Sequence, residues 1–408
     1  MRGLRVLHVI GGGDSGGAMT HLLPLLSALR RTGCDVHLLC LGEGRLAEEA
    51  TRRGLSVAVL PMGHAWDASV LEPLRRILAG GPNDLDALRA RGAGGQSRPE
   101  GLDRSVRSRW DVVHTHGMRA NLPVRLVLKV RRRRPCLFTT VHSDLRLDYA
   151  SPPLARFYQG LDRATLSTVD TVICVSEALR ALLVSRGHPA KCLVTIRSGI
   201  ELPEEGARPV EGAGTSASRA RLGTIARLVP VKDIDLLLEV AALLCRTHRE
   251  VEVVIVGDGP ERVRLERRAR ALGLAGVVRF TGRREDIAAL LGGWDVYMVT
   301  STFEGGVSMA VLEAMTAALP VVTTAAGGVE EAVKAGETGF VVRRDQERGA
   351  LAAALAERAA ALLDDPELRV RMGAAGARRV RDVFAVERTA EATLHAYERC
   401  LAARGALL

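Results

Sequence analysis

The stretch that decides the fold is DVYMVTSTFEGGVSMAVLEAMTAALPVV, residues 295–322. An apolar run ends at Ser301, a glycine turn follows, and a second apolar run starts at Pro320. Between them lies a run with helical periodicity that carries Glu313. Strand, helix and strand in this order are the repeating unit of a parallel sheet, so the segment predicts an α/β fold.

The start of this predicted helix has the chemistry of an anion site. The first N–H groups of a helix have no partner inside the helix, and they attract negative charge. Here they belong to Val307, Ser308 and Met309. Glu304 precedes the helix and Glu313 lies within it, and a carboxylate in that position can accept hydrogen bonds from ribose hydroxyls.

Apolar runs of strand length recur along the whole chain and alternate with helical patterns. Seven lie in the first half, at 4–10, 35–41, 56–61, 111–116, 136–142, 171–176 and 192–200. Six lie in the second half, at 221–228, 251–257, 277–282, 295–301, 320–328 and 339–342. The alternation predicts two doubly wound parallel sheets.

A chain of 408 residues is expected to form two domains. We predict a first domain over 1–201, a linker rich in Pro, Gly, Ala and Ser over 202–220, and a second domain over 221–383. The last segment, 384–408, has a helix pattern without a strand partner, and we expect it to cross back to the first domain. The Gly- and Arg-rich stretch from 80 to 109 predicts a loop or an irregular helix.

Composition narrows the classes of partner and compartment. Aromatic residues make up 3% of the chain, which argues against a nucleic-acid platform despite a net charge of +10. The seven cysteines form no C-x-x-C pair and predict reduced thiols rather than disulfides or zinc ligands. No apolar run is long enough to span a bilayer, and the first strand is too short for a signal peptide, so we expect a cytoplasmic protein.

One basic cluster favours a location at the inner face of a membrane. Arg131, Arg132, Arg133 and Arg134 follow an apolar helical stretch and predict contact with anionic lipid. A solvated helix end, in which basic residues complement the helix dipole, explains the cluster equally well.

The glycine loop near the N-terminus, VLHVIGGGDSGGAMTH at 6–21, allows two interpretations. Gly11, Gly13 and Gly16 have the G-x-G-x-x-G spacing of a dinucleotide site, for which Glu43 is the only acidic candidate to bind the ribose. The alternative is a glycine-rich turn from strand to helix without that role.

Taken together, these motifs resemble those of the retaining GT-B glycosyltransferases of family GT4 (glycosyltransferase group 1). The pattern that carries the resemblance is E-G-x(n)-L-E-A-M-x-x-x-x-P-V-V followed by G-G-V-x-E, preceded by HTHG, TTVHSD, VSE and ARLVPVKD in the order of that family. The resemblance implies two Rossmann-like domains that face a cleft. It also implies a nucleotide-sugar donor held by the second domain and an acceptor held by the first.

The resemblance assigns roles to particular residues. Arg227 and Lys232 resemble the basic pair that grips the donor diphosphate, where fixed cations stabilise the charge of the leaving group. His142 resembles the histidine that lies against the transferred sugar. Glu304 and Glu313 resemble the two glutamates of the family, one near the reacting sugar and the other on the ribose.

Other positions receive supporting roles or none. Gly16 and Gly17 are expected to approach the donor phosphates or the acceptor, and Gly282 with Arg283 to read the base. His114 and His116 end a strand without a third ligand at metal-like spacing, so they predict a structural edge of the cleft rather than a metal site. Asp233 and Asp235 have a D-x-D spacing, which we attribute to helix capping and solvation.

The chain departs from the family signature at one position. Glu304 and Glu313 lie nine positions apart, where the family has eight. We expect Gly305 and Gly306 to absorb the extra residue because glycine adopts unusual backbone angles at low steric cost. If they do not, the first glutamate of the family is lost.

The resemblance implies a retaining hexosyltransferase that uses a UDP-linked sugar, needs no metal and no further cofactor, and acts on a glycan, lipid-linked or cell-envelope acceptor. Two alternatives remain open. One is an NAD(P)-dependent oxidoreductase that uses the N-terminal glycine loop, and the other is a non-catalytic protein that binds nucleotide sugars.

Overall fold

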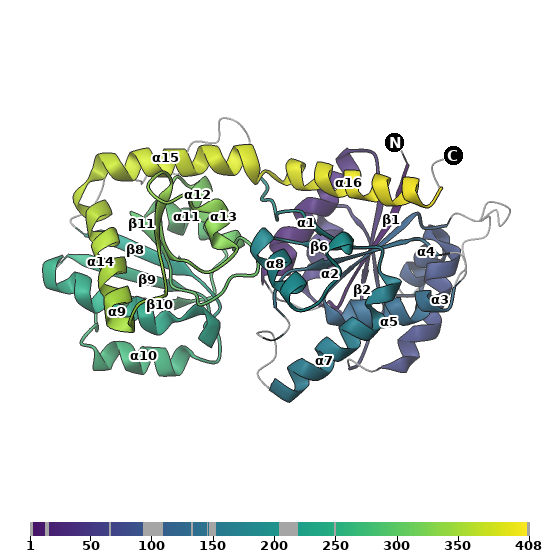
Figure 1. Ribbon diagram of the computed structural model, residues 1–408, viewed down its shortest axis with the longest axis horizontal. Coiled ribbons are helices and arrows are strands. Elements are labelled where there is room, and N and C mark those ends of the chain that lie inside the picture. Colours follow the sequence, from purple (N-terminus) through teal and green to yellow (C-terminus); the bar gives the residue numbers. More distant parts are fainter. Residues whose placement is uncertain are drawn as a thin grey trace. The chain divides into compact units, whose positions relative to one another are not determined.

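The computed structural model describes residues 3–12, 16–64, 67–92, 109–131, 134–144, 146, 152–203, 219–248 and 250–405. The chain divides into two compact units (Figure 1). The first unit comprises Met1–Gly199 and Val386–Leu408, and the second comprises Ile200–Ala385. Most of the predicted linker, residues 204–218, lies outside the described residues.

The first unit is built on a seven-stranded parallel sheet with the order β3-β2-β1-β4-β5-β6-β7. All seven strands predicted for this half are confirmed. They are β1 (Arg5–Ile10), β2 (Asp35–Cys40), β3 (Ser56–Val59), β4 (Val112–His116), β5 (Cys136–Val141), β6 (Thr171–Cys174) and β7 (Leu193–Thr195).

Helices cover both faces of this sheet, so the sheet is doubly wound (Figure 1). One face packs against α1 (Gly16–Arg31), α2 (Arg45–Arg52) and α16 (Val386–Ala403). The other face packs against α3 (Leu71–Gly80), α4 (Pro82–Gly92), α5 (Met118–Lys129) and α8 (Glu177–Ser185), with α7 (Pro152–Thr165) against α5. Part of the stretch predicted as a loop or irregular helix is therefore α4, and residues 93–108 lie outside the described part.

The C-terminal helix α16 completes the core of the first unit. Its buried residues Val386, Ala390, Tyr397 and Leu401 join the cluster that holds the apolar face of α1 against the sheet. Apolar burial stabilises by roughly 25 cal/mol per Å², so a helix with this apolar stripe packs onto a sheet face rather than standing in solvent.

The second unit contains a six-stranded parallel sheet with the order β10-β9-β8-β11-β12-β13. All six predicted strands are confirmed: β8 (Ala220–Ile225), β9 (Val251–Val256), β10 (Val278–Gly282), β11 (Val296–Val299), β12 (Val321–Thr324) and β13 (Gly339–Val342). One face packs against α9 (Ile234–Thr247), α10 (Arg262–Ala271) and α14 (Arg348–Asp364). The other packs against α11 (Ile287–Gly292), α12 (Met309–Thr316), α13 (Val329–Ala332) and α15 (Pro366–Val383).

The strand order fixes where a ligand can bind in the second unit. The chain runs outward from β8 through β9 to β10, and then returns to start again at β11, beside β8. In open α/β sheets ligands bind beyond the carboxyl ends of the strands at such a reversal. The segments that follow β8 and β11 contain Arg227, Lys232 and Glu304.

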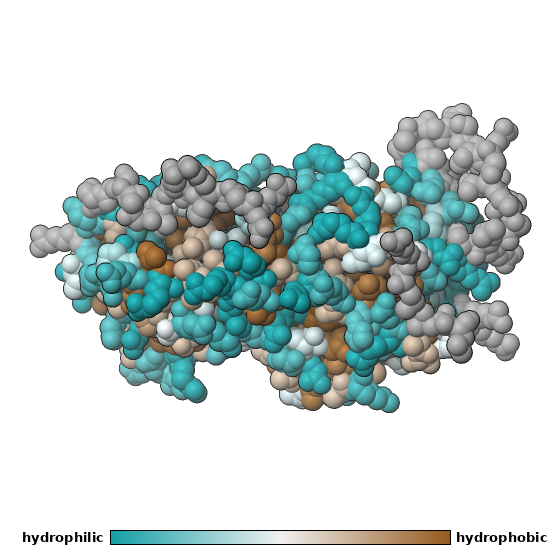
Figure 2. All heavy atoms as spheres, turned by 90° about the horizontal axis from the view of Figure 1, so that it is seen from above, coloured by the Kyte–Doolittle hydropathy of each residue, from teal (hydrophilic) through white to brown (hydrophobic). Residues whose placement is uncertain are grey.

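Figure 2 shows one face of the molecule, on which many hydrophilic residues surround areas of apolar residues. None of the described helices is long and apolar enough to cross a bilayer.

Candidate functional site

Lys232 and Glu304 form an ion pair at the carboxyl ends of β8 and β11. The Lys232 Nζ lies 2.6 Å from Glu304 Oε1, and the same oxygen accepts a hydrogen bond of 2.6 Å from the Ser301 hydroxyl. The Glu304 side chain is 10% exposed and that of Lys232 21%. The structure therefore brings together two residues that the sequence placed 72 positions apart.

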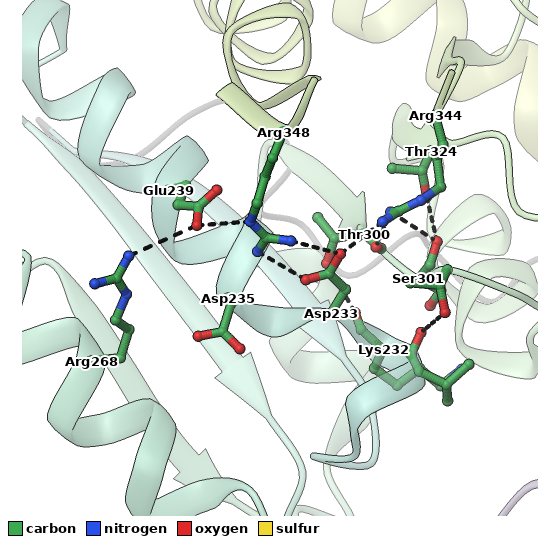
Figure 3. A network of polar contacts seen from close by, with 12 residues as sticks. Lys232, Asp233, Asp235, Glu239, Arg268, Thr300, Ser301, Thr324, Arg344 and Arg348 are labelled. Atoms are coloured by element: carbon green, nitrogen blue, oxygen red, sulfur yellow. Dashed lines mark hydrogen bonds and ion pairs between the residues drawn. The ribbon is translucent and has the colours of Figure 1, made fainter. Parts of the chain in front are cut away.

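An aspartate next to this lysine is held by two arginines. Asp233 adopts a left-handed conformation, with φ 45° and ψ 50°. Its carboxylate accepts hydrogen bonds from Arg344, at 2.8 Å, and from Arg348, at 3.0 Å and 3.3 Å (Figure 3). The capping role expected for this residue is wrong, because its side chain makes no cap hydrogen bond at the start of α9. The arginines instead take up both carboxylate oxygens.

Arg344 also links the turn at Asp233 to the end of β11. Arg344 donates to the carbonyl oxygen of Thr300 at 3.0 Å, and the Thr300 hydroxyl donates to the carbonyl of Lys232 at 3.1 Å (Figure 3). A non-glycine residue with positive φ costs roughly 1–3 kcal/mol and persists only where surrounding contacts enforce it. These contacts hold the turn from which Lys232 projects.

The second aspartate of the D-x-D pair also serves in ion pairing. Asp235 binds Arg264 at 2.9 Å, and the hydrogen bonds from that guanidinium lower the pKa of Asp235. Both carboxylates are thus neutralised by arginines, and this pair has no unpaired charge with which to bind a cation.

The turn after Glu304 does not show the unusual backbone angles that we expected of its two glycines. Neither Gly305 nor Gly306 has a positive φ. Instead, Gly306 lies so close to Gly328 that a Cβ on Gly328 would fall 2.4 Å from the Gly306 carbonyl carbon. The Glu304 main chain bonds to this neighbouring loop in both directions, from its N–H to Ala326 O at 2.7 Å and from Gly328 N–H to its carbonyl at 2.9 Å.

A Gly328→Ala substitution is expected to damage this turn. Real Cβ atoms essentially never approach to under 3.0 Å, so the main chain of Gly306 must move and Glu304 with it. We expect a loss of about 1–3 kcal/mol in the free energy of unfolding, which is usual for overpacking, together with loss of activity. Chemical denaturation measures the first effect. Gly349→Ala, at a position with nothing within 4 Å of the added Cβ, is the control and is expected to leave both properties unchanged.

Glu313 is a half-buried carboxylate without a hydrogen-bond partner among the described residues. It lies on α12, and no described residue donates a hydrogen bond to its side chain. Burial raises the pKa of Glu313 to about 7. Both Glu313 and Glu304 add, after burial itself, to the upward shift in the pKa of Tyr297, so the two acids approach the same tyrosine.

The start of α12 offers unpaired donors close by in the sequence. Ser308 is the N-cap residue but makes no side-chain cap bond. Among the described residues, nothing accepts a hydrogen bond from the main-chain N–H groups of Val307, Ser308 and Met309. The predicted anion site therefore has its donors available, and the helix dipole adds to their attraction for negative charge.

The remaining predicted residues of the second unit differ in their surroundings. Arg227 is exposed, and its guanidinium has no partner within the described chain. Gly282 has a φ of 72°, and its carbonyl accepts a hydrogen bond from Gly257 N–H at 2.9 Å, while Arg283 is exposed beside it. A Cβ on Gly257 would lie 2.0 Å from the Ala226 carbonyl oxygen, so the neighbouring IVGDGP turn, residues 255–260, needs glycine for a close main-chain approach.

In the first unit, His8, His114 and His116 meet in the interior. Strands β1 and β4 are neighbours, and their register places His8 beside His114. The three side chains are 0%, 0% and 3% exposed, and one ring nitrogen of each lies within 4.8 Å of the others. His114 and His116 are therefore buried inside the unit, and His8 supplies a third ring nitrogen that the sequence spacing did not reveal. Their expected structural rather than metal-binding role stays a prediction.

Hydrogen bonds account for all six ring nitrogens of these three histidines. His114 bonds to the Tyr397 hydroxyl of α16 and to the Thr140 hydroxyl, both at 2.6 Å. The other contacts are His8 to His116 at 3.0 Å, His8 to Tyr397 at 3.4 Å, and His116 to His142 at 3.4 Å. His142, the predicted catalytic histidine, is thus the last member of a continuous series of hydrogen-bonded side chains in the core.

Burial keeps this cluster neutral. It lowers the pKa of His8 to about 3 and that of His142 to about 4. It also lowers the pKa of His21 to about 3, and the Nδ1 of this residue is buried without a partner in the described chain. His142 lines a pocket of the first unit together with polar residues, among them Asp144, Arg146, Gln159 and Arg163.

The N-terminal glycine loop is partly described. Gly12 has a φ of 74°, and a Cβ there would lie 2.5 Å from the Gly42 carbonyl oxygen, so glycine is needed for a close main-chain approach. Gly16 and Gly17 begin α1. Residues 13–15 lie outside the described chain, and the role of this loop toward a ligand stays a prediction.

The basic cluster after α5 is not uniformly available. Arg134 pairs with Asp170 at 2.9 Å, and a buried nitrogen of Arg131 has no partner in the described part of the chain. Arg132 and Arg133 lie outside the described residues.

Two parallel-sheet α/β units, the second with a basic and acidic site at its strand reversal, define a protein of the GT-B class. Residues 214–379 match the model of glycosyl transferases group 1, and residues 16–199 match that of the glycosyl transferase 4-like domain. The D-inositol 3-phosphate glycosyltransferase of Kineococcus radiotolerans is 30% identical over 97% of this chain and 93% of its own. The chain therefore belongs to the group 1 glycosyltransferases of family GT4.

Other similar proteins extend this comparison. The GPI3 subunit of the yeast phosphatidylinositol N-acetylglucosaminyltransferase is 25% identical over 55% of this chain, which spans about half of that subunit (50%). The crystal structure of Anabaena Alr3699/HepE in complex with UDP-glucose covers 97% of this chain and 99% of its own, with a TM-score of 0.73 and 19% identity. That likeness supports the GT-B fold, and the family does not favour the oxidoreductase alternative.

Several contacts that shape the site were not predicted from the sequence. Ser301, Asp233 and Arg344 join the Lys232–Glu304 region, and Tyr397 joins the histidines, only through long-range contacts. The one available signal was the position of Ser301 and Asp233 directly after a predicted strand or before a predicted helix.

Proposed function

We propose that the protein is a retaining, metal-independent hexosyltransferase that takes its sugar from a UDP-linked donor. The observation that carries the proposal is a combination of three features beyond the carboxyl ends of β8 and β11: an exposed arginine, an ion-paired lysine, and N–H groups that have no acceptor among the described residues. Arg227, Lys232 and the start of α12 provide positive charge for a diphosphate without a divalent cation. The complexes of the Anabaena protein with UDP and UDP-glucose support the choice of nucleotide.

The proposed roles follow from the chemistry of each group. When the bond to the anomeric carbon breaks, negative charge develops on the departing diphosphate, and Arg227 and Lys232 stabilise it. Glu313, which has no hydrogen-bond partner in the described part of the chain, accepts hydrogen bonds from the ribose hydroxyls. Glu304 and His142 serve the transferred sugar, as the family resemblance implies, and Gly282 with Arg283 contacts the base.

The proposed acceptor is a glycan, a lipid-linked molecule or a cell-envelope precursor. Polar side chains around the His142 pocket suit an acceptor rich in hydroxyl groups. A cytoplasmic protein that works at the inner face of the membrane fits such acceptors.

The experiment that tests the proposal is thermal stabilisation by a panel of nucleotides, nucleotide sugars and NAD(P). We expect UDP and one UDP-sugar to stabilise the wild-type protein, and Arg227→Ala to lose that shift. Arg371→Ala is the matched control, because Arg371 is also exposed and without a partner in the described chain. A shift with NAD(P) alone would support the oxidoreductase. Binding of a UDP-sugar without any transfer or hydrolysis would support the non-catalytic alternative.

The role of Glu313 predicts a pH dependence of UDP binding. With a pKa near 7, this carboxyl is ionised at pH 8 and mostly protonated at pH 6. If the ribose of UDP binds only to the ionised carboxylate, UDP should bind about tenfold more weakly at pH 6 than at pH 8. The reason is that one pH unit below the pKa leaves about a tenth of the Glu313 carboxyl ionised. Calorimetric titration of UDP measures this difference.

Glu313→Gln is the control for the titration of UDP itself. The variant should bind UDP weakly at both pH values and lose the part of the pH dependence that belongs to Glu313. The same pH dependence in the variant and in the wild-type protein would contradict the assignment.

We propose membrane contact through the end of α5 as a separate property. Val130 is 84% exposed between Lys129 and Arg131, which combines an apolar side chain with positive charge. The ion pair with Asp170 removes Arg134 from this surface. Co-sedimentation with vesicles should be greater with anionic than with neutral lipid. Equal binding to both would contradict this proposal.

A further inference from the structure

Two cysteines that are far apart in the sequence meet in the first unit. Cys136 is the first residue of β5, and Cys400 lies in the last turn of α16. Their sulfur atoms lie 2.6 Å apart, although the residues are separated by 264 positions. Cys136 is buried at 1% exposure, whereas Cys400 is partly exposed. None of the residues assigned to sugar transfer takes part in this contact.

The surrounding residues fix both ends of the pair. The Cys136 main chain is held in β5, which is paired with β4. Arg404, one turn beyond Cys400, donates to the carbonyl oxygens of Arg134, at 2.9 Å, and Pro135, at 3.0 Å. The end of α16 is thereby attached to the two residues that immediately precede Cys136. This attachment and the pairing of β5 lie on either side of the contact between the two sulfur atoms.

We propose that Cys136 and Cys400 form a reversible disulfide that ties the C-terminal helix to the central sheet of the first unit. The proposal rests on the contact between the two thiols and is independent of the proposed function. It reverses the expectation from the sequence that all seven cysteines stay reduced.

The environment also sets the order of the two chemical steps. The Cys136 thiol lowers the pKa of Cys400 by hydrogen bonding, and this effect, with the charges of Arg404 and Arg134, outweighs the opposing effects of burial and of Asp170. Cys400 is therefore the attacking thiolate, and its partial exposure lets it meet a small disulfide such as glutathione disulfide.

The reaction is a thiol–disulfide exchange in two steps. The Cys400 thiolate attacks one sulfur of glutathione disulfide, forms a mixed disulfide and releases one glutathione thiolate. The Cys136 thiol then loses its proton and attacks the Cys400 sulfur, which expels the second glutathione. The two cysteines are oxidised by two electrons, glutathione disulfide is reduced by two, and the two protons end on the two glutathione molecules.

A metal site at the same place is less compatible with the charges. Asp170 lies close enough to both sulfurs to complete a three-ligand set. Its carboxylate, however, already accepts hydrogen bonds from Arg134, Arg404 and the Leu137 N–H. Two guanidinium groups beside the thiols also repel a cation, so we favour the disulfide.

The disulfide would fix the end of α16, the helix that contacts the histidine cluster through Tyr397. Tyr397 lies one turn before Cys400, and its hydroxyl bonds to His114 at 2.6 Å. A cross-link that closes so long a loop lowers the entropy of the unfolded chain. We expect the oxidised protein to show a melting temperature about 5–10 °C higher for the first unit than the reduced protein.

The test uses the full chain, fully reduced and then equilibrated with glutathione disulfide. Free thiols of the denatured protein should fall from seven to five, and a non-reducing digest should contain one peptide pair joined through Cys136 and Cys400. Cys136→Ala should accumulate the mixed disulfide at Cys400. Cys400→Ala should leave Cys136 reduced. Cys192→Ala, which removes another partly exposed thiol, is the control and should form the cross-link normally.

Two results would overturn the proposal. One is the persistence of seven free thiols, or a cross-link between other cysteines, under conditions in which the protein remains folded. The other is stoichiometric binding of zinc that protects both thiols from alkylation and is lost in either alanine variant, because that would identify a metal site.

Discussion

Lys232→Met is expected to lower the turnover of the sugar nucleotide by about 10²–10³-fold, the effect of removing one fixed group that stabilises charge in a transition state. Lys232 provides a cation near the end of β8, and its Nζ already contacts Glu304 at 2.6 Å. The substitution removes a positive charge that stabilises the negative leaving group. It also leaves the Ser301 hydroxyl as the one side-chain partner of Glu304 among the described residues. Both effects act on the same reaction.

The measurement is the slow hydrolysis of the sugar nucleotide selected by the thermal panel, which requires no knowledge of the acceptor. Lys334→Met is the matched control, since it makes the same substitution at an exposed lysine of the same unit and should leave the rate unchanged. Lys232→Met alone should also lower the free energy of unfolding, because it leaves the Glu304 carboxylate without its cation. The double variant with Glu304→Gln removes that carboxylate and should recover the stability but not the turnover. A Lys232→Met rate within threefold of the wild-type rate would contradict the proposed role.

Acid is expected to unfold the first unit at a pH at which the second is still folded. The folded-state pKa values of His8, His21 and His142 are about 3, 3 and 4, against 6.5 in the unfolded chain. Above pH 6.5 these histidines are neutral in the folded and in the unfolded chain, so they do not change the free energy of unfolding. Between pH 6.5 and about 4 the unfolded chain binds protons that the folded chain refuses, so stability falls as the pH falls.

The size of this effect is large relative to ordinary protein stability. At pH 5 each of the three histidines lowers the free energy of unfolding by about 2 kcal/mol, because pH 5 is 1.5 units below the pKa in the unfolded chain and one unit corresponds to roughly 1.4 kcal/mol. Their sum of about 6 kcal/mol is comparable to the whole stability of many domains, which is about 5–15 kcal/mol. His114 and His116, whose pKa values are also lowered by burial, act in the same direction.

Hydrogen exchange followed by mass spectrometry measures the two units separately. Protection in β1, β4 and β5 should be lost near pH 5, while β8 and β9 remain protected. The second unit is an internal control, because His248 is the only one of the ten histidines within its bounds. His21→Leu removes one buried titrating group and should move the transition of the first unit to lower pH. Loss of protection at the same pH in both units would contradict the proposed role of the buried histidines.

The fold could be predicted to the level of single strands because the signals are local. Each of the thirteen strands in the two sheets is a short apolar run between turn residues, and burial on both faces makes such runs continuous. The positions of Lys232, Glu304 and Glu313 could be predicted for a similar reason, because the ends of strands and the starts of helices are visible in the sequence. Their roles in transfer stay predictions.

The contacts of the site could not be predicted because they join distant segments. Asp233 looked like a cap residue from its position before a helix, but arginines 111 and 115 positions away take its carboxylate. The glycines after Glu304 were expected to adopt unusual backbone angles, but neither has a positive φ, and the close main-chain approach found here requires glycine at 328, on another loop. In both cases a tertiary contact outweighs the local preference.

The sequence by itself determined the two α/β units, the family and the order of the motifs, since these depend on periodicity and residue type along short segments. Only the tertiary structure decided which side chains meet. The strand order places β1 beside β4 and so creates the histidine cluster, and the packing of α16 brings Tyr397 to His114 and Cys400 to Cys136. Such pairings depend on strand order, register and helix packing, which arise from the burial of whole apolar faces rather than from any single segment.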